Sequence, residues 1–419
     1  MDKLKFTNKP YIIKKEDIST IDFSIIFPCT YDYNHMYDTL LIKQIVANTS
    51  EKYKTEQEFK KQKLKNMIIR YNVNTFRCNH NLFFEFDLTI PNPKKVKTFE
   101  LESAFKFFVD AIYHPNIEDE AFNHYQFERE KEYIKMSIQD SLKNIYQYSY
   151  QRFIHYCDDN GLLKNNIHQN IEMLDKVNSK DLLSYYKKII IHNNPICYVY
   201  GDVEENYINK LFEKYFPLEQ KNIILKKDYN CFLKPCLQTK EIEEKSNYNQ
   251  SALYMGYKVQ NMKEEEKEYL SLICNILNGK ENDLIFKALR IENNLIYSPY
   301  FNYYKNYGLF VIEVYLKSDS KEKVIHVIQK VMNDLNNETF LKECLEKSLK
   351  GIKYDLLEQE DSKYAQFNEY IDKSLQINYT LKEKYQFYKN VDIKNLIQFL
   401  NRIKLDTIYF LRGENDEKK

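Results

Sequence analysis

One succession of helix, strand and glycine turn occurs twice in this chain of 419 residues, and no other feature constrains the fold as strongly. Residues 177–186 place a capping Asn or Ser before an apolar helical period, and they lead into the apolar run 196–200, which a glycine closes. Residues 391–400 lead in the same way into the run 407–411, which is also followed by a glycine. This recurrence at nearly equal spacing predicts an internal duplication.

The correspondence continues upstream of these elements. Residues 118–122 open a long charged amphipathic helix, and residues 337–340 open another at a similar distance before its strand. Each half also begins with a strand-like run, at residues 21–27 in the first half and 251–257 in the second. Four matches in one order predict two homologous domains.

The expected fold class is α+β, with two tandem α/β domains that each contain a mixed, mostly antiparallel sheet with helices packed on one face. Residues 81–90 and 308–316 alternate in part between apolar and polar side chains, as strands do in an antiparallel sheet with one covered face. The charged segment 217–249 is the predicted connection between the domains. We therefore expect domains at residues 1–225 and 226–419.

The composition excludes several classes of function. Lys and Arg total 62 against 61 for Asp and Glu, so the charge balance favours neither nucleic acid nor an anionic membrane as a partner. Only 7 glycines are present, and no glycine-rich phosphate-binding loop occurs. The sequence contains neither a signal-peptide pattern nor an apolar stretch long enough to span a membrane, so a cytoplasmic location is expected. The eight cysteines are scattered and are expected to be free thiols.

The helix expected at residues 37–49, the charged helix at 127–138 and the segment 286–297 together resemble the pitrilysin and insulinase family of metallopeptidases, which includes the mitochondrial processing peptidases. The resemblance covers nearly the whole chain and implies a processing-peptidase-like fold. In that family the first helix carries His-x-x-Glu-His, in which two imidazoles bind zinc and the glutamate activates water. A glutamate of the second helix completes the ligand set.

Residues unsuited to zinc occupy these motif positions. Thr39, Ile42 and Lys43 stand in the first helix, and Ser137 stands where the second helix should supply its glutamate. Thr is a poor zinc ligand, Ile cannot activate water, and Lys would bring a positive charge beside the metal. No His-x-x-Glu-His occurs anywhere in the chain, so the absence does not depend on the alignment. The resemblance therefore implies a degenerate zinc site, with no catalytic and no metal-binding residue.

The second half holds the residues expected to contact substrate. Arg290 and Tyr297 are seven residues apart, as are the Arg and Tyr with which the family's second domain reaches the peptide. In this resemblance Arg290 would donate to a carbonyl or carboxylate, and Tyr297 would contribute a hydroxyl. Equally, both residues could be retained for packing and a surface ion pair.

Glu120, His124 and Glu128 offer an alternative, a displaced metal site, because they are spaced four residues apart in an expected helix. A solvated helix face with short-range charge pairs explains the same spacing.

The leading hypothesis is a non-catalytic subunit of a two-component, zinc-dependent peptidase. We expect this chain to be inactive alone and to form a heterodimer with a related subunit that carries the His-x-x-Glu-His site, so that zinc is needed only in the partner. The two would enclose a chamber for a peptide substrate, with a role in peptide or leader processing. The alternative is a stand-alone peptide-binding or scaffold protein with no proteolytic role.

Overall fold

The computed structural model describes residues 9–78, 81–158, 163, 171–216, 232–296, 298–375 and 379–414. Its internal contacts divide the chain into two compact units. The first unit consists of residues 1–140 and 165–228, and the second of residues 141–164 and 229–419. The boundary predicted near residue 225 lies outside the described residues. The second unit includes a segment, 141–164, that precedes this boundary.

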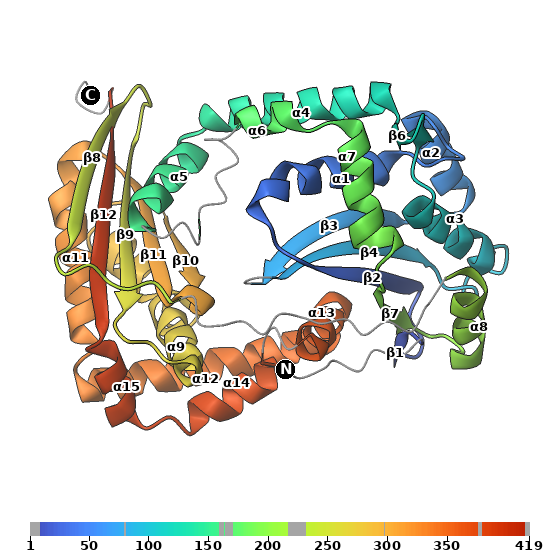
Figure 1. Ribbon diagram of the computed structural model, residues 1–419. Coiled ribbons are helices and arrows are strands. Elements are labelled where there is room, and N and C mark those ends of the chain that lie inside the picture. Colours follow the sequence, from blue (N-terminus) through green and yellow to red (C-terminus); the bar gives the residue numbers. More distant parts are fainter. Residues whose placement is uncertain are drawn as a thin grey trace. The chain divides into compact units, whose positions relative to one another are not determined.

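A five-stranded mixed sheet forms the centre of the first unit (Figure 1). Its strands, in spatial order, are β1 (Tyr11–Lys14), β7 (Ile196–Gly201), β2 (Thr20–Thr30), β4 (Asn81–Pro91) and β3 (Arg70–Cys78). β1 and β7 are parallel, and the other three pairs are antiparallel.

Helices cover the apolar face of this sheet. They are α1 (Met36–Asn48), α2 (Glu56–Lys65), α3 (Leu101–Tyr113), α4 (His124–Leu142), α6 (Ile171–Lys176), α7 (Ser179–Tyr186) and α8 (Glu205–Tyr215), and a two-stranded hairpin of β5 (Ile117–Glu118) and β6 (Ala121–Phe122) precedes α4. Alternate residues of the central strands, such as Phe23 and Ile25 on β2 and Phe86 on β4, are buried in one cluster with Ile42 of α1 and Phe105 of α3. The apolar residues that recur every second position in the strands therefore pack against those that recur with the helical period of 3.6 residues, and together they form one core.

The second unit repeats this topology. Its sheet has the order β8 (Lys240–Ser246), β12 (Ile403–Gly413), β9 (Ser251–Val259), β11 (Leu309–Leu316) and β10 (Pro299–Tyr304). As in the first unit, the first two strands are parallel and every later pair is antiparallel. β7 of the first unit corresponds to β12 of the second, and β2 corresponds to β9. These are the strands whose sequence patterns matched, so the predicted duplication and the α+β fold are confirmed.

Both faces of the second sheet are covered. On one side lie α9 (Lys267–Asn278), α10 (Leu284–Phe286), α11 (Lys321–Asp334), α12 (Glu338–Asp361), α14 (Leu381–Lys389) and α15 (Ile393–Leu400), with α13 (Lys363–Ser374) following α12 in the chain. On the other side lies α5 (Ile145–Cys157), which Figure 1 shows against the strands of this sheet. Leu253 and Met255 of β9 belong to the first cluster, whereas Tyr254 packs with Phe153 of α5. The sequence predicted a sheet with helices on one face only, whereas in this unit α5 also covers the opposite face of the sheet.

Two expectations from composition can be compared with the described part of the chain. The six cysteines whose side chains it includes are free. None of its helices combines the length and the apolar character needed to cross a membrane.

Candidate functional site

The degenerate motif lies on α1, and its side chains do not fit a zinc site. The Thr39 hydroxyl donates to the backbone carbonyl of His35 over 2.9 Å, so it serves the first turn of the helix. Ile42 is fully buried in the hydrophobic core. Ser137 is exposed on α4. Within the described ranges, no three His, Cys, Asp or Glu side chains are grouped so that they could hold a metal ion.

The alternative metal site on one helix face is wrong. α4 begins at His124, and Glu120 precedes it in the turn between β5 and β6 with a left-handed backbone, φ 60°. Only His124 and Glu128 therefore share the helix, because the segment expected to open it forms a hairpin instead.

Two hydrogen bonds of the Gln126 side chain attach α4 to the C-terminal end of α1. The Gln126 amide nitrogen donates to the carbonyl of Ile45 over 2.9 Å, and the Thr49 hydroxyl donates to the Gln126 amide oxygen over 2.6 Å. Gln126 is almost fully buried. The polar contact between these two helices therefore has a structural role.

Arg290 lies in a turn of π-helix, Lys287–Glu292, that follows the short helix α10. One guanidinium nitrogen, Nη1, donates to the side-chain oxygen of Asn294 over 2.8 Å and to the backbone carbonyl of Ile296 over 3.0 Å. These bonds hold the segment that leads to β10. Tyr297 lies outside the described residues, so the joint role of Arg290 and Tyr297 in substrate binding stays a prediction.

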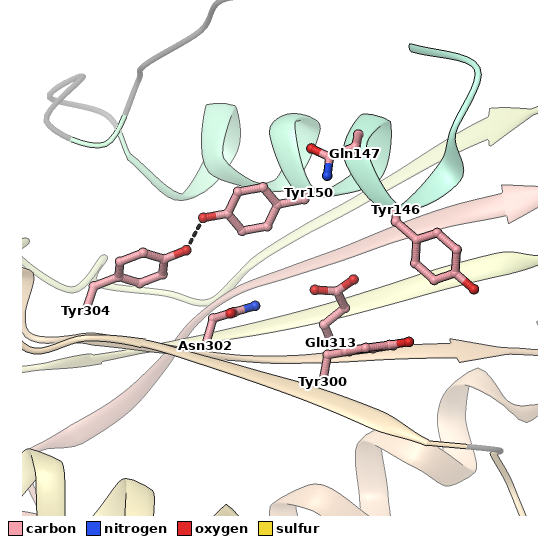
Figure 2. A pocket seen from close by; sticks show the side chains of 7 residues that line it. All are labelled: Tyr146, Gln147, Tyr150, Tyr300, Asn302, Tyr304 and Glu313. Carbon is pink, nitrogen blue, oxygen red and sulfur yellow. Dashed lines mark hydrogen bonds between the residues drawn. The ribbon is translucent and has the colours of Figure 1, made fainter. Parts of the chain in front are cut away.

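A pocket of about 500 Å³ lies inside the second unit, between α5 and the edge of the sheet. We call it the tyrosine pocket. Figure 2 shows its lining side chains, which are Tyr146, Gln147 and Tyr150 of α5, Tyr300, Asn302 and Tyr304 of β10, and Glu313 of β11.

The period of the strand explains how β10 lines this pocket. Tyr300, Asn302 and Tyr304 alternate along β10 and therefore share the face toward α5, whereas Phe301 packs into the core on the other side. Tyr300 is directly opposite Glu313 in the antiparallel register. The sheet thus fixes a carboxyl group beside an aromatic ring.

The Glu313 carboxyl is the one acidic group of the pocket lining, and its side chain is only 6% exposed. Burial raises its pKa, and hydrogen bonds with the Tyr315 and Tyr254 hydroxyls offset part of that rise. At the other end of the pocket the hydroxyls of Tyr150 and Tyr304 meet (Figure 2). Burial raises the pKa of both phenols.

An ion-pair network holds α5 against the sheet next to the pocket. Arg152 Nε donates to Glu244 of β8 over 3.0 Å, and the hydroxyls of Tyr156 and Tyr409 donate to the same carboxylate over 2.7 and 2.8 Å. Burial opposes ionisation of Glu244, but these donors, with Arg152 first, lower its pKa to about 2. The wall that α5 contributes is therefore anchored to β8 and β12.

Sequence reasoning missed the tyrosine pocket, although one signal for it was present. Glu313 is the only ionisable carboxylate in the otherwise apolar run Leu309–Leu316. A charged residue inside a fully buried strand is rare unless it has a partner or a function.

Comparisons with known proteins agree with the fold. Residues 176–352 match the family described as the peptidase M16 inactive domain. The chain is 23% identical over 333 residues to the probable inactive metalloprotease YmfF of Bacillus subtilis strain 168, covering 78% of each protein. A conserved protein from Enterococcus faecalis V583 superposes with a TM-score of 0.80 at 17% identity, covering 96% of both chains. A peptidase M16 inactive domain from Pseudomonas fluorescens gives 0.72 at 11% identity, covering 96% of this chain and 95% of that one.

Proposed function

This chain carries a peptidase M16 inactive domain, and from that premise we propose that it is the non-catalytic subunit of a heterodimeric zinc-dependent peptidase. One observation carries the proposal. The fold of the family is complete in both units, yet α1 presents Thr39, Ile42 and Lys43 where an active member presents two zinc ligands and a general base. A chain that keeps the architecture without the chemistry is suited to completing a site in another subunit.

In this proposal the partner is a related, cytoplasmic subunit with an intact His-x-x-Glu-His helix, and zinc is bound only there. The present chain supplies part of the wall of a peptide-binding chamber, and Arg290 with Tyr297 contacts the substrate. The bonds that Arg290 makes to the turn before β10 are compatible with this role, because they fix the guanidinium in one place. The reaction of the complex is the processing of a peptide or leader sequence.

The test is to mix the chain with a motif-bearing relative from the same organism. Size-exclusion chromatography with light scattering should give a one-to-one heterodimer. Zinc-dependent cleavage of a peptide library should rise above that of the relative alone. A variant of the relative in which the motif glutamate is replaced by Gln should still associate but should abolish cleavage, because the activity then belongs to the partner's site.

Two further results decide against the proposal. If the two chains neither associate nor change each other's activity, it is wrong. If this chain binds peptides by itself and ignores the relative, the stand-alone peptide-binding alternative is correct.

A further inference from the structure

We propose that the tyrosine pocket binds an organic cation, an ammonium or guanidinium group, with Glu313 as its counter-ion. The pocket lies wholly inside the second unit, so this proposal does not depend on a partner subunit or on the proposed function.

The first argument is the setting of Glu313. Its side chain is almost fully buried, and the hydrogen bonds that it receives come from tyrosine hydroxyls. Throughout the described residues, no Lys, Arg or His forms an ion pair with it. A buried carboxylate without a cation is costly, so burial favours the neutral carboxyl group until a cation enters the pocket and pairs with the carboxylate.

The second argument is the number of protons available to a row of hydrogen-bonded hydroxyl groups that ends at Glu313, which we call the hydroxyl chain. The Ser149 hydroxyl lies 2.5 Å from the carbonyl of Ile145 and 2.8 Å from the hydroxyl of Tyr254. Tyr254 lies 3.0 Å from the hydroxyl of Tyr315, which in turn contacts Glu313. The Tyr254 hydroxyl also reaches Glu313, so the contacts of this chain outnumber the protons of its three hydroxyl groups. A protonated Glu313 supplies one more proton.

Binding a cation should therefore release a proton. In the empty pocket the neutral carboxyl group completes the hydroxyl chain. When a cation arrives, the carboxyl loses its proton to the buffer, and the carboxylate then pairs with the cation. The other titratable groups facing Glu313 are all phenols: Tyr146, Tyr150, Tyr300 and Tyr304 of the pocket lining, and Tyr254 and Tyr315 of the hydroxyl chain. Burial raises the pKa of Tyr150, Tyr304, Tyr254 and Tyr315, so these hydroxyls hold their protons. The released proton can come only from Glu313.

The third argument is the aromatic wall. Tyr146 and Tyr300 are 43% and 50% exposed, so part of each ring is accessible from outside. Their centroids are 6.2 Å apart with an interplanar angle of 72°, and Figure 2 shows the Glu313 carboxyl between the two elements that carry them. Ring faces attract cations, and the amide oxygens of Gln147 and Asn302 can accept additional N–H donors.

The test is calorimetric titration of the full chain with acetyl-Gly-Arg-Gly-amide and with the same peptide carrying citrulline, the neutral isostere of arginine. We expect the arginine peptide to bind about tenfold more tightly or better, because a charged hydrogen-bonded pair is lost with citrulline. Its affinity should rise from pH 5 to pH 8, and its heat should vary with the ionisation enthalpy of the buffer. Methylguanidinium distinguishes the source of the cation. If it binds as tightly as the arginine peptide, the natural ligand is a free small cation. If it binds more weakly than the peptide, the natural ligand is a side chain within a peptide.

Glu313→Gln should remove the preference for arginine over citrulline. The variant should still fold, because its amide can donate to Tyr315 as the protonated carboxyl does. Tyr300→Leu alters an exposed ring and should weaken binding about two- to fivefold. Glu346→Gln, which removes an exposed carboxylate from α12, should bind like the unaltered chain.

The proposal is overturned if the two peptides bind equally, if neither binds, or if Glu313→Gln keeps the preference for arginine. Should Glu313→Gln fail to fold, unchanged arginine binding by Tyr300→Leu overturns it instead.

Discussion

Lys258 and Asp406 form an ion pair in the interior of the second unit, with Nζ of the lysine 2.8 Å from Oδ2 of the aspartate and both side chains at most 2% exposed. Lys258 also donates to the carbonyl of Cys157 at the end of α5 over 2.6 Å. Asp406, which lies at an irregularity in β12, accepts from the amide of Cys236 and the hydroxyl of Thr407, each over 2.7 Å. The pair therefore joins α5, β9 and β12.

Replacing one partner of this pair should be severely destabilising. Lys258→Met leaves the Asp406 carboxylate buried without its cation, which typically costs about 3–5 kcal/mol of unfolding free energy. Urea denaturation should show this loss, and Lys258→Met combined with Asp406→Leu should recover part of it because no charge then remains buried. Lys323→Met on the exposed face of α11 serves as the control and should change little. A cost below 1 kcal/mol for Lys258→Met would contradict the role assigned to the pair.

Gly256 lets α5 approach β9, and a methyl group there should displace the helix. A Cβ atom at Gly256 would lie 2.8 Å from Cζ of Phe153, closer than packed atoms come. Because Phe153 is fully buried, Gly256→Ala should destabilise the second unit by about 1–3 kcal/mol. Hydrogen exchange should accelerate in residues 145–157 more than in α12.

The matched control for this prediction is Gly351→Ala. Gly351 lies within helix α12, where alanine is favoured over glycine by up to about 1 kcal/mol. The added methyl would lie 2.9 Å from Cγ of Glu281, but that side chain is partly exposed and can rotate away, whereas the buried ring of Phe153 cannot. Equal protection of residues 145–157 in Gly256→Ala and in the unaltered chain would show that the close approach is unimportant.

The duplicated fold could be predicted because its signals are local. Strands β7 and β12 are apolar runs closed by glycine, and the missing zinc motif is a property of residue types that no packing can alter. The placement of α5 could not be predicted. Its apolar positions indicate a helix with one covered face, but which sheet covers that face depends on contacts such as Phe153 with Tyr254, 101 residues later.

Long-range contacts and backbone conformations that the sequence does not reveal also explain why the tyrosine pocket was missed and why the helix at residue 118 was wrongly predicted. The tyrosine pocket needs β10, β11 and α5 to meet, so the isolated carboxylate Glu313 was its sole trace in the sequence. The helix expected from residue 118 fails because Asp119 and Glu120 adopt left-handed backbones, which close a hairpin. Neither residue is a glycine, so the turn left no clear mark in the sequence.

Zinc should neither copurify with this chain nor stabilise it. The side chains of Thr39, Ile42 and Lys43 offer no pair of zinc ligands. Zinc bound at one hundred times its Kd would raise the unfolding free energy by about 2.7 kcal/mol, and we expect no such gain. We expect well under one zinc per chain by elemental analysis and the same Tm with EDTA or with added zinc chloride. Stoichiometric zinc whose removal lowers Tm would disprove the degenerate-site interpretation.

The stability of the first unit should fall as pH rises from about 4 to 7. Burial, followed by repulsion from Glu85, raises the pKa of Asp87 from its usual range to about 7. A folded-state pKa above the unfolded value means that the folded state binds the extra proton, so the favourable contribution is present at low pH and is lost as pH rises through 7.

Asp87→Asn should therefore stabilise the chain at pH 8 by about 1–3 kcal/mol and should have little effect at pH 4.5, where the native carboxyl is already neutral. The amide can still accept from Asn74, whose side-chain nitrogen lies 3.3 Å from Asp87, so this hydrogen bond is retained. Urea unfolding of both proteins at the two pH values measures the difference. Asp334→Asn, at an exposed position on α11, controls for the general loss of one negative charge and should show no such pH dependence. If Asp87→Asn is no more stable than the unaltered chain at pH 8, the carboxyl is not strained by its burial beside Glu85.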